Sequence, residues 1–539
     1  MADTLKASKQ GLEIVDRARR RRGWTKTRTP AWWDSAYTTQ ATLKRFWRGI
    51  AIQRENFIAI CQAVGLPNWK AIAEGVEDEN RDFSVEELRP VVHSTEAPTQ
   101  FNRLDWGEAP DLPFFYGRDL ELQKLDRWIV GDRCKLVTLL GMGGAGKTSL
   151  AVTVVERLGE QFECVWWRSL LGAPPLDFLL EQLIQFVSQG TETLASSNLQ
   201  QAITRAIALL NRHRCLIVLD EAEAILGGGG GQSYCPGYEG YGDFFKRVGS
   251  DRHQSCVLLT SREKPGEVVA YEGQMLPVRS LQLGGLKRQE ALHVLETKGL
   301  SVSENELSLL TDFYSGNPLA LKTIATTIQE LFGGNTAAFL HQNTLVLGDR
   351  LRGLLAQQFD RLSHRETEVL YWLALDPEPL PVEQLHSYLL FSPPRSHLLE
   401  TLAALERRSL IDKISNEGEI RFTLQPLVMK YVSENFTQQS LAEIKAVLDN
   451  RDIESFRVLK THAPITRTGA EKKTHPSVQV LPRLVKALPR GLGCDEAQVA
   501  KKLETLLPLL HGRSPQVIGY IESNLKAILN NLNSEARSR

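Results

Sequence analysis

Short apolar runs alternate with stretches of helical periodicity in the middle of the chain. The apolar runs cover 136–140, 165–167, 215–219 and 256–259, and the helical stretches among them include 147–158 and 178–187. Near-continuous apolar strands that alternate with helices are typical of a parallel sheet covered on both faces. The pattern predicts an α/β domain whose ligand lies at the carboxyl ends of the strands.

The segments on either side of this α/β domain have different patterns. Residues 363–436 give three helical stretches and then apolar runs at 410–414 and 420–423, which flank Asn416-Glu417-Gly418. Helices followed by such a hairpin are typical of a winged helix. The predicted fold class is therefore multidomain α/β and α. We expect a basic helix-turn-helix-like domain, a linker, the α/β domain, a helical domain, a winged-helix domain and a helical region at 1–75, 76–112, 113–280, 281–350, 351–437 and 438–539.

The first 75 residues combine short helices with positive charge. They hold 5 Lys and 9 Arg against 3 Asp and 3 Glu, although the whole chain has a formal net charge of zero. A predicted helix at 40–48 resembles the reading helix of a helix-turn-helix domain and would present Gln40, Thr42, Lys44, Arg45 and Arg48. DNA binding is one interpretation. The other is a helical adaptor with a solvated basic face, because a basic helical face alone is weak evidence.

One short segment carries a specific ligand-binding pattern. Gly141-Met142-Gly143-Gly144-Ala145-Gly146-Lys147-Thr148 follows an apolar strand and opens a helix, as a phosphate-binding loop must. Its glycines permit a nest of backbone N–H donors at the positive end of the helix dipole. Lys147 would neutralise phosphate charge, and the Thr148 hydroxyl would bind Mg²⁺. We expect a nucleotide to be bound by Gly141, Gly143, Gly144, Ala145, Gly146, Lys147, Thr148 and Ser149.

Charged residues follow two of the predicted strands. Asp220 and Glu221 end the third apolar run, and Arg262 follows the fourth. Asp220 suits a Mg²⁺ ligand, Glu221 could orient or deprotonate the attacking water, and Arg262 could sense the γ-phosphate. With Lys147, these are the candidate catalytic residues. The alternatives are solvated strand ends for the carboxylates and a surface ion pair for the arginine.

A glycine-rich segment separates the two charged strand ends. Five consecutive glycines at 227–231 precede Tyr234, Tyr238 and Tyr241. Because five glycines in a row cannot hold a helix or a strand, we expect a mobile loop. A lid over the site is one interpretation, and a tolerated insertion is the preferred one.

Composition adds few constraints. The chain has 539 residues, 42% of them apolar and 24% charged, which is ordinary for a soluble protein of several domains. Its seven cysteines are scattered without a C-x-x-C pair and indicate thiols in a reducing compartment. The N-terminus lacks an apolar signal core, and no run approaches the roughly 18 apolar residues of a membrane span. We expect a cytoplasmic protein without membrane contact.

The order of the motifs resembles the NB-ARC family of signalling NTPases, within the STAND class of switch ATPases. The resemblance covers roughly 112–436 and adds three segments to the phosphate-binding loop and the charged strand ends: Tyr116-Gly117-Arg118, Leu283-Gly284-Gly285-Leu286 and Gly316-Asn317-Pro318-Leu319-Ala320-Leu321. It implies that the motif with Tyr116 and Arg118 binds the nucleotide and that the arginine contacts the nucleobase. It also implies that Pro318 packs against the bound nucleotide.

One position departs from the family pattern. The family's winged helix usually ends in a Met-His-Asp triplet whose histidine holds the β-phosphate of ADP, and the matching place here is Leu424-Gln425-Pro426. Gln425 can donate a hydrogen bond but carries no charge. In bacterial members with a comparable N-terminal module, a helical region like 438–539 is usually followed by a repeat sensor, and we expect this chain to lack one.

The resemblance implies a switch that hydrolyses ATP slowly. ADP would hold the nucleotide domain, the helical domain and the winged helix together. ATP with Mg²⁺ would loosen them and expose surfaces for self-association and for a protein effector or sensor. Two other interpretations stay open: an ATP-regulated transcription regulator that binds DNA through 1–75, and a constitutive ATPase motor.

Overall fold

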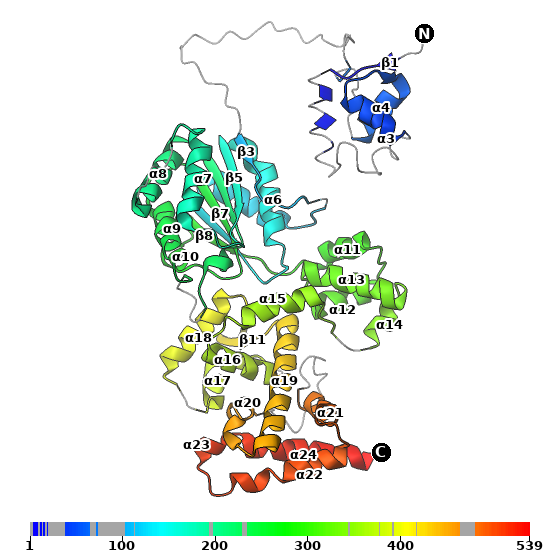
Figure 1. The fold of residues 1–539 in the computed structure, drawn as a ribbon, viewed down its shortest axis with the longest axis vertical. Helices are drawn as coiled ribbons and strands as arrows, with labels where there is room; N and C mark the ends of the chain where they lie inside the picture. Colours follow the sequence, from blue (N-terminus) through cyan, green and yellow to red (C-terminus); the bar gives the residue numbers. More distant parts are fainter. Residues whose placement is uncertain are drawn as a thin grey trace. The chain divides into compact units, whose positions relative to one another are not determined.

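The structure is a computed structural model in two compact units, one of 1–100 with 110–115 and one of 101–109 with 116–539 (Figure 1). It describes residues 4–8, 11–12, 15–16, 19, 38–64, 72–73, 103–112, 114–192, 198–228, 234–342, 345–376, 378–390, 393–416, 418–463 and 480–538. Among these residues, no helix is both long enough and apolar enough to span a bilayer.

The first unit contains a pair of helices and a short ribbon. β1 (Thr4–Leu5) pairs antiparallel with β2 (Ile52–Gln53), and β2 lies between α3 (Gln40–Trp47) and α4 (Arg54–Ala63). The predicted helix at 40–48 is confirmed, because its apolar positions i, i+3 and i+4 face the core of this unit. Lys44, Arg45 and Arg48 are exposed. The helix-turn-helix assignment stays a prediction.

The second unit starts with a six-stranded parallel sheet in the order β3-β5-β6-β7-β4-β8. Its strands are β3 (Arg103–Asp105), β4 (Leu136–Leu140), β5 (Cys164–Ser169), β6 (Cys215–Asp220), β7 (Cys256–Ser261) and β8 (Val278–Gln282). Every residue of β4, β6 and β7 is buried, which explains their unbroken apolar runs. The register pairs Leu140 with Ser261 and with Gln282, so these strands end at one edge.

Helices pack on this sheet, with α7 and α8 on one side and α6 on the other (Figure 1). They are α5 (Asp119–Asp126), α6 (Lys147–Leu158), α7 (Leu176–Ser188), α8 (Leu199–Arg212), α9 (Gly240–Ser250) and α10 (Gly266–Tyr271). The two helices predicted at 147–158 and 178–187 are confirmed as α6 and α7. The predicted α/β architecture is therefore correct.

Two regions after the sheet share one hydrophobic core. The helical region (281–350) contains α11 (Arg288–Thr297), α12 (Glu304–Phe313), α13 (Pro318–Phe332), α14 (Thr336–Leu340) and the start of α15 (Asp349–Phe359). The hairpin region (351–437) contains α16 (His364–Leu375), β9 (Leu380–Pro381), α17 (Val382–Tyr388), α18 (Arg395–Arg407), β10 (Asp412–Asn416) and β11 (Glu419–Thr423). The hairpin lies where the sequence predicted it. Classification of this region as a winged helix stays a prediction.

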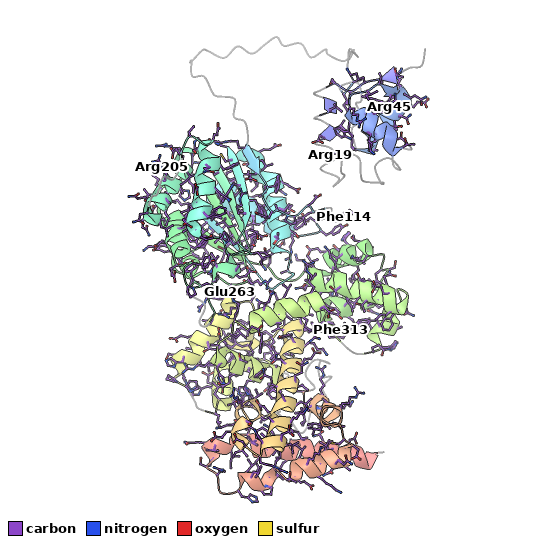
Figure 2. All side chains as sticks on the ribbon, viewed as in Figure 1. Arg19, Arg45, Phe114, Arg205, Glu263 and Phe313 are labelled. Carbon is purple, nitrogen blue, oxygen red and sulfur yellow. The ribbon has the colours of Figure 1, made fainter. Side chains whose placement is uncertain are left out.

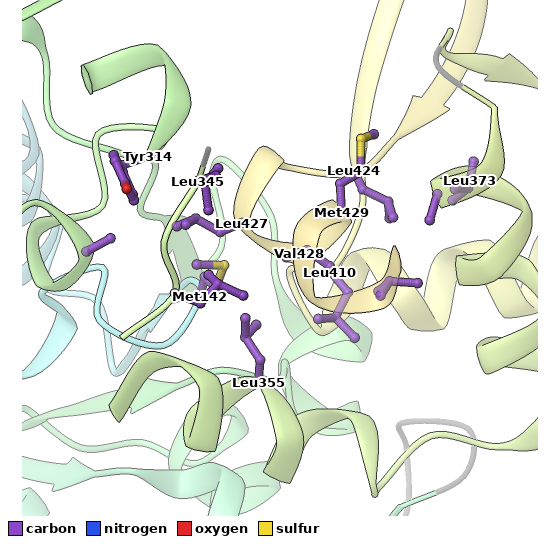
Figure 3. Packing of buried hydrophobic residues seen from close by; sticks show 14 of the residues in the cluster. Met142, Tyr314, Leu345, Leu355, Leu373, Leu410, Leu424, Leu427, Val428 and Met429 are labelled. Carbon is purple, nitrogen blue, oxygen red and sulfur yellow. The ribbon is translucent and has the colours of Figure 1, made fainter. Parts of the chain in front are cut away.

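This shared core also takes in Met142 of the phosphate-binding loop. Figure 3 shows Met142 beside Leu355 of α15 and Leu427 of α19 (Pro426–Asn450), in the cluster that also includes Tyr314 and Leu345. The loop that follows β4 is therefore packed against both later regions. This contact positions the candidate site at a junction of three parts of the chain.

The last part of the chain is helical, as predicted. α19 (Pro426–Asn450) is followed by α20 (Val458–Thr461), α21 (Val480–Leu492), α22 (Glu496–Glu504), α23 (Pro515–Ile518) and α24 (Ile521–Ser538). The expected boundary between 437 and 438 falls inside α19, because no glycine or proline interrupts that helix after its first residue. Residues 464–479 of this part lie outside the described residues.

The expected linker at 76–112 is wrong at its end. Arg103–Asp105 form the edge strand β3, parallel to β5. Arg103 also donates hydrogen bonds to the carbonyls of Phe186 (3.0 Å) and Val187 (2.7 Å) at the end of α7. Three residues are too few to show a strand period in the sequence. The linker residues before 103 lie outside the described residues.

The expected mobile loop does not extend to its tyrosines. Residues 229–233 lie outside the described residues, but Tyr234 donates to Glu267 (2.6 Å), Tyr238 to the carbonyl of Ala173 (2.6 Å) and Tyr241 to that of Pro174 (2.8 Å). Buried tyrosines need such partners for their hydroxyl groups. The interpretation as a tolerated insertion is wrong for these residues, which are part of the domain core.

All seven cysteines are free thiols, as expected.

Candidate functional site

The loop between β4 and α6 has a backbone that requires glycine. Gly144 and Gly146 have φ angles of +80° and +93°, which lie in the left-handed region. A Cβ on Gly144 would lie only 2.6 Å from Cβ of Leu319, so the helical region approaches the loop closely. The glycines thus serve both the nest of N–H donors and the contact with α13.

Lys147 is folded back onto its own loop. Its ammonium donates to the carbonyls of Gly141 (2.8 Å) and Met142 (3.2 Å), and the residue is only 8% exposed. Burial lowers the pKa of Lys147, while the charge of Glu223 opposes that shift. A buried ammonium bound by loop carbonyls is in place to exchange them for phosphate oxygens, which bind it more strongly.

Asp220 and Thr148 meet at the carboxyl edge of the sheet. Asp220 Oδ1 accepts hydrogen bonds from Thr148 Oγ1 (3.0 Å) and from the hydroxyl of Thr260. Burial raises the pKa of Asp220 to about 6, although the two hydroxyl groups lower it. A hydroxyl oxygen and a carboxylate oxygen side by side fit the oxygen ligands that Mg²⁺ prefers. These are the two residues that the sequence predicted as metal ligands.

Glu221 and Arg262 are both bound to other protein groups. Glu221 has a φ of +62° and accepts a hydrogen bond from Ser169 Oγ (3.0 Å). Arg262 Nε is paired with Glu223 Oε1 at 2.9 Å. A Cβ on Gly143 would lie 3.8 Å from Arg262 Nε, so the guanidinium nevertheless lies beside the phosphate-binding loop. Sequence reasoning missed Glu223, although its position two residues after Glu221 was a usable signal.

Arg118 is bound to the loop backbone and to the segment after β8. Its guanidinium donates to the carbonyls of Ala145 (3.2 Å) and Gly284 (2.6 Å), and the residue is 4% exposed. Tyr116 stacks on His293 with a centroid distance of 5.7 Å. These two residues therefore join the loop, the strand edge and α11. Their predicted contact with a nucleotide base stays a prediction.

The start of α13 touches the phosphate-binding loop directly. Asn317 Nδ2 donates to the carbonyl of Gly143 (3.1 Å), and the Leu319 amide donates to that of Gly144 (3.4 Å). Asn317 Oδ1 also caps α13, whose first residue is Pro318. Pro318 Cγ lies 3.9 Å from the Cβ position of Gly146, and its packing against a bound nucleotide stays a prediction. Asn317 is a second residue whose role the sequence did not reveal.

Gln425 lies between the hairpin strand β11 and α19. It is the N-cap residue of α19, and its amide donates to Asp412 Oδ1 (3.2 Å). It lines a cavity of about 510 Å³ together with Leu140 and Gln282, the last residues of β4 and β8. Ser149, the last residue predicted to bind the nucleotide, is half-buried in the first turn of α6.

Known proteins resemble this chain over different spans. Residues 118–223 match the NB-ARC domain family. An uncharacterised WD repeat-containing protein of Nostoc sp. is 37% identical over 98% of this chain and 45% of its own length. The disease resistance protein RGA2 of Solanum bulbocastanum is 28% identical over 28% of this chain and 15% of its own length. The chain thus spans less than half the length of these relatives.

A solved structure also aligns with most of the chain. It is the crystal structure of a STAND protein with a tetratricopeptide repeat sensor from Pyrococcus horikoshii, which matches 82% of this chain and 60% of its own. The identity is 18%, and the TM-score is 0.33.

The raised pKa of Asp220 leads to a prediction about stability. Because the folded-state pKa, about 6, exceeds that of a free aspartate, stability is lost as the pH rises through about 6. Asp220→Asn cannot ionise, so its stability relative to the wild type should increase by roughly 1.4 kcal/mol between pH 5 and pH 7.5, at 1.36 kcal/mol per pKa unit. Urea denaturation at the two pH values, without nucleotide, measures this change.

Asp251→Asn is the control. Burial raises the pKa of Asp251, but hydrogen bonds from Arg247 and Ser250 outweigh this effect and leave the pKa below its ordinary value. Asp251 is therefore already ionised at pH 5. The relative stability of this variant should not change between pH 5 and pH 7.5. An equally constant difference for Asp220→Asn would contradict the assignment of a buried, ionisable metal ligand.

Proposed function

The chain belongs to the NB-ARC family of STAND-class NTPases, and on that premise we propose that it is a nucleotide-controlled signalling switch. In this proposal, ADP favours the arrangement in which the helical and hairpin regions are docked on the α/β domain. ATP favours an arrangement in which they are released and assembly surfaces are exposed. The protein hydrolyses ATP slowly, since the state and not the turnover carries the signal.

One observation carries the proposal. The segment that would bind phosphates is the segment that Asn317 and Leu319 bind through its carbonyl groups. A ligand that reshapes this loop therefore acts on α13 without an intermediate element. Nucleotides can shift the equilibrium only through different affinities for the two states, and about 5.5 kcal/mol is needed to invert a 1:99 population.

The side chains at the site divide the work of binding. Lys147 would leave the carbonyls of Gly141 and Met142 and neutralise the phosphates. Thr148 and Asp220 would hold Mg²⁺, which when bound neutralises charge between neighbouring phosphate groups. Arg262 would sense the γ-phosphate, and Glu221 would orient the attacking water.

The positions of the last two residues favour a switch over a motor. Glu221 is bound to Ser169, and Arg262 is paired with Glu223, so neither is free to act on a γ-phosphate in this arrangement. Both must change partners before hydrolysis. A catalytic group that has to leave a stable contact reacts slowly until the domains rearrange.

Partners and location follow from the same proposal. Release of the helical and hairpin regions would permit self-association and contact with a protein effector, in a cytoplasmic setting. The Nostoc relative is named for its WD repeats, and we take repeats of that class as the sensor that acts with this chain.

The nucleotide site is tested by Lys147→Ala. Loss of the charge-assisted contacts of Lys147, worth about 3 kcal/mol, should weaken ADP and ATP binding by at least about 100-fold in a calorimetric titration. Lys135→Ala is the control, because Lys135 lies at the opposite end of β4 and donates to the carbonyl of Asp251 (2.7 Å). Equal nucleotide affinities for the wild type and Lys147→Ala would refute the assignment of the site. The rate of hydrolysis is a separate test, because fast steady-state ATP turnover by the wild type would favour a motor.

A second function, regulation of transcription, is favoured by the exposure of Lys44, Arg45 and Arg48 on α3. If this helix binds DNA, affinity should fall steeply with salt, and neutralising all three residues should abolish binding and flatten the salt dependence. Fluorescence anisotropy with duplex DNA at several salt concentrations measures both effects. Identical weak binding by the wild type and the neutralised variant would leave the adaptor interpretation of 1–75.

A further inference from the structure

We propose that Glu223 couples the γ-phosphate sensor to the docking of the hairpin region. Its carboxylate holds Arg262 while no γ-phosphate is present, and its backbone carbonyl holds Arg361 of the hairpin region. Binding of ATP would take Arg262 away from Glu223 and thereby weaken the hold on Arg361. The inference rests on the proposed nucleotide switch and names the residue that transmits the signal from the site.

Both oxygens of the Glu223 carboxylate contact Arg262. Its Oε1 lies 2.9 Å from Arg262 Nε, and its Oε2 accepts a hydrogen bond from the Arg262 amide (3.1 Å). Glu223 is 8% exposed, so its charge has little access to water. Arg262 is the partner that keeps this buried charge tolerable, since a buried carboxylate without a partner costs several kcal/mol.

Backbone carbonyls at and near Glu223 accept hydrogen bonds from Arg361. Arg361 Nη1 donates to the carbonyl of Glu223 (2.8 Å), and Nη2 donates to the carbonyl of Leu226. Glu223 lies within a single turn of 3-10 helix, Ala222–Ile225, and Leu226 directly follows that turn, so a shift of Glu223 moves both acceptors. Arg361 itself lies between α15 and α16, at the entrance to the hairpin region.

A second set of charges joins the same two parts of the molecule. Glu263, the residue after the sensor arginine, lies 3.4 Å from Arg361 Nη2 and 3.9 Å from Arg408 Nε. Arg408 is also 3.5 Å from Glu366 of α16, and it donates to the carbonyl of Arg361 (3.0 Å). Figure 2 shows Glu263 where the α/β domain meets the hairpin region.

This second set is buried but imperfectly bonded. Glu263, Arg408 and Glu366 are 3%, 1% and 2% exposed. Among the described residues, Glu263 Oε2, Glu366 Oε1 and Arg408 Nε and Nη2 have no hydrogen-bond partner. Buried charges that are only loosely paired regain hydration when an interface opens, so such an interface separates more easily than an apolar one. The hairpin region is therefore held by contacts suited to release.

The coupling follows from competition for one guanidinium. A γ-phosphate carries more negative charge than a carboxylate and binds arginine through charge-assisted hydrogen bonds. When Arg262 turns to it, the Glu223 carboxylate loses its cation and must reach water or another positive group. Either movement displaces the turn at 222–225 and with it the two carbonyls that hold Arg361. ATP binding and docking of the hairpin region thus become mutually unfavourable.

Glu223→Gln in the full chain tests the coupling. The variant keeps the shape of the side chain and the backbone carbonyl but holds Arg262 less strongly. We expect the ratio of the ADP and ATP dissociation constants to rise about tenfold in favour of ATP, with limited proteolysis cutting faster near 361 and 408. Glu192→Gln is the matched control, because Glu192 forms a comparable pair with Arg205 at 2.7 Å on the same domain. It should leave both readouts unchanged.

A second variant keeps the inference falsifiable if Glu223→Gln does not fold. Arg361→Gln removes the far end of the coupling without touching the nucleotide site, and it should also raise both the preference for ATP and the cleavage rate. If the wild type binds nucleotide but the folded variants keep its ratio of ADP to ATP dissociation constants, the inference is overturned while the proposed switch stands. No nucleotide binding by the wild type would overturn the proposed switch as well.

Discussion

The phosphate-binding loop has to serve two sets of partners with one backbone. Its N–H groups are the donors for phosphate, while its carbonyls accept hydrogen bonds from Lys147, Asn317 and Arg118. Glycine makes both possible, because a Cβ on Gly144 would collide with Leu319. The rest of the second unit depends on this double use, since it places the helical region on the loop.

The charged residues at the ends of β6 and β7 also have protein partners. Asp220 ends β6 and Arg262 follows β7, and both are bound by other side chains: Asp220 accepts hydrogen bonds from two hydroxyl groups, and Arg262 pairs with Glu223. Such contacts keep the groups ordered but occupied. Because the same segments bind Arg361 and Arg408, the occupation of the site and the docking of the hairpin region are linked through shared residues.

The sequence predicts those features that depend on local pattern. A buried strand, glycines and Lys147-Thr148 identify the loop, and the residue at the end of β6 is the expected Asp220. The sequence does not reveal features that depend on distant partners. Asn317 bonds a residue 174 positions away and Arg361 one 138 positions away, and no local period marks either. The short strand β3 was missed for the related reason that only its pairing with β5 defines it.

The most direct test of the account is amide hydrogen exchange of α13 and the turn at 222–225, in the full chain with ADP and with a non-hydrolysable ATP analogue. The Leu319 amide donates to the loop, and the turn at 222–225 holds Arg361. The account predicts protection at both places with ADP and faster exchange at both with the ATP analogue. The same exchange pattern with the two nucleotides, both at saturating concentration, would contradict it.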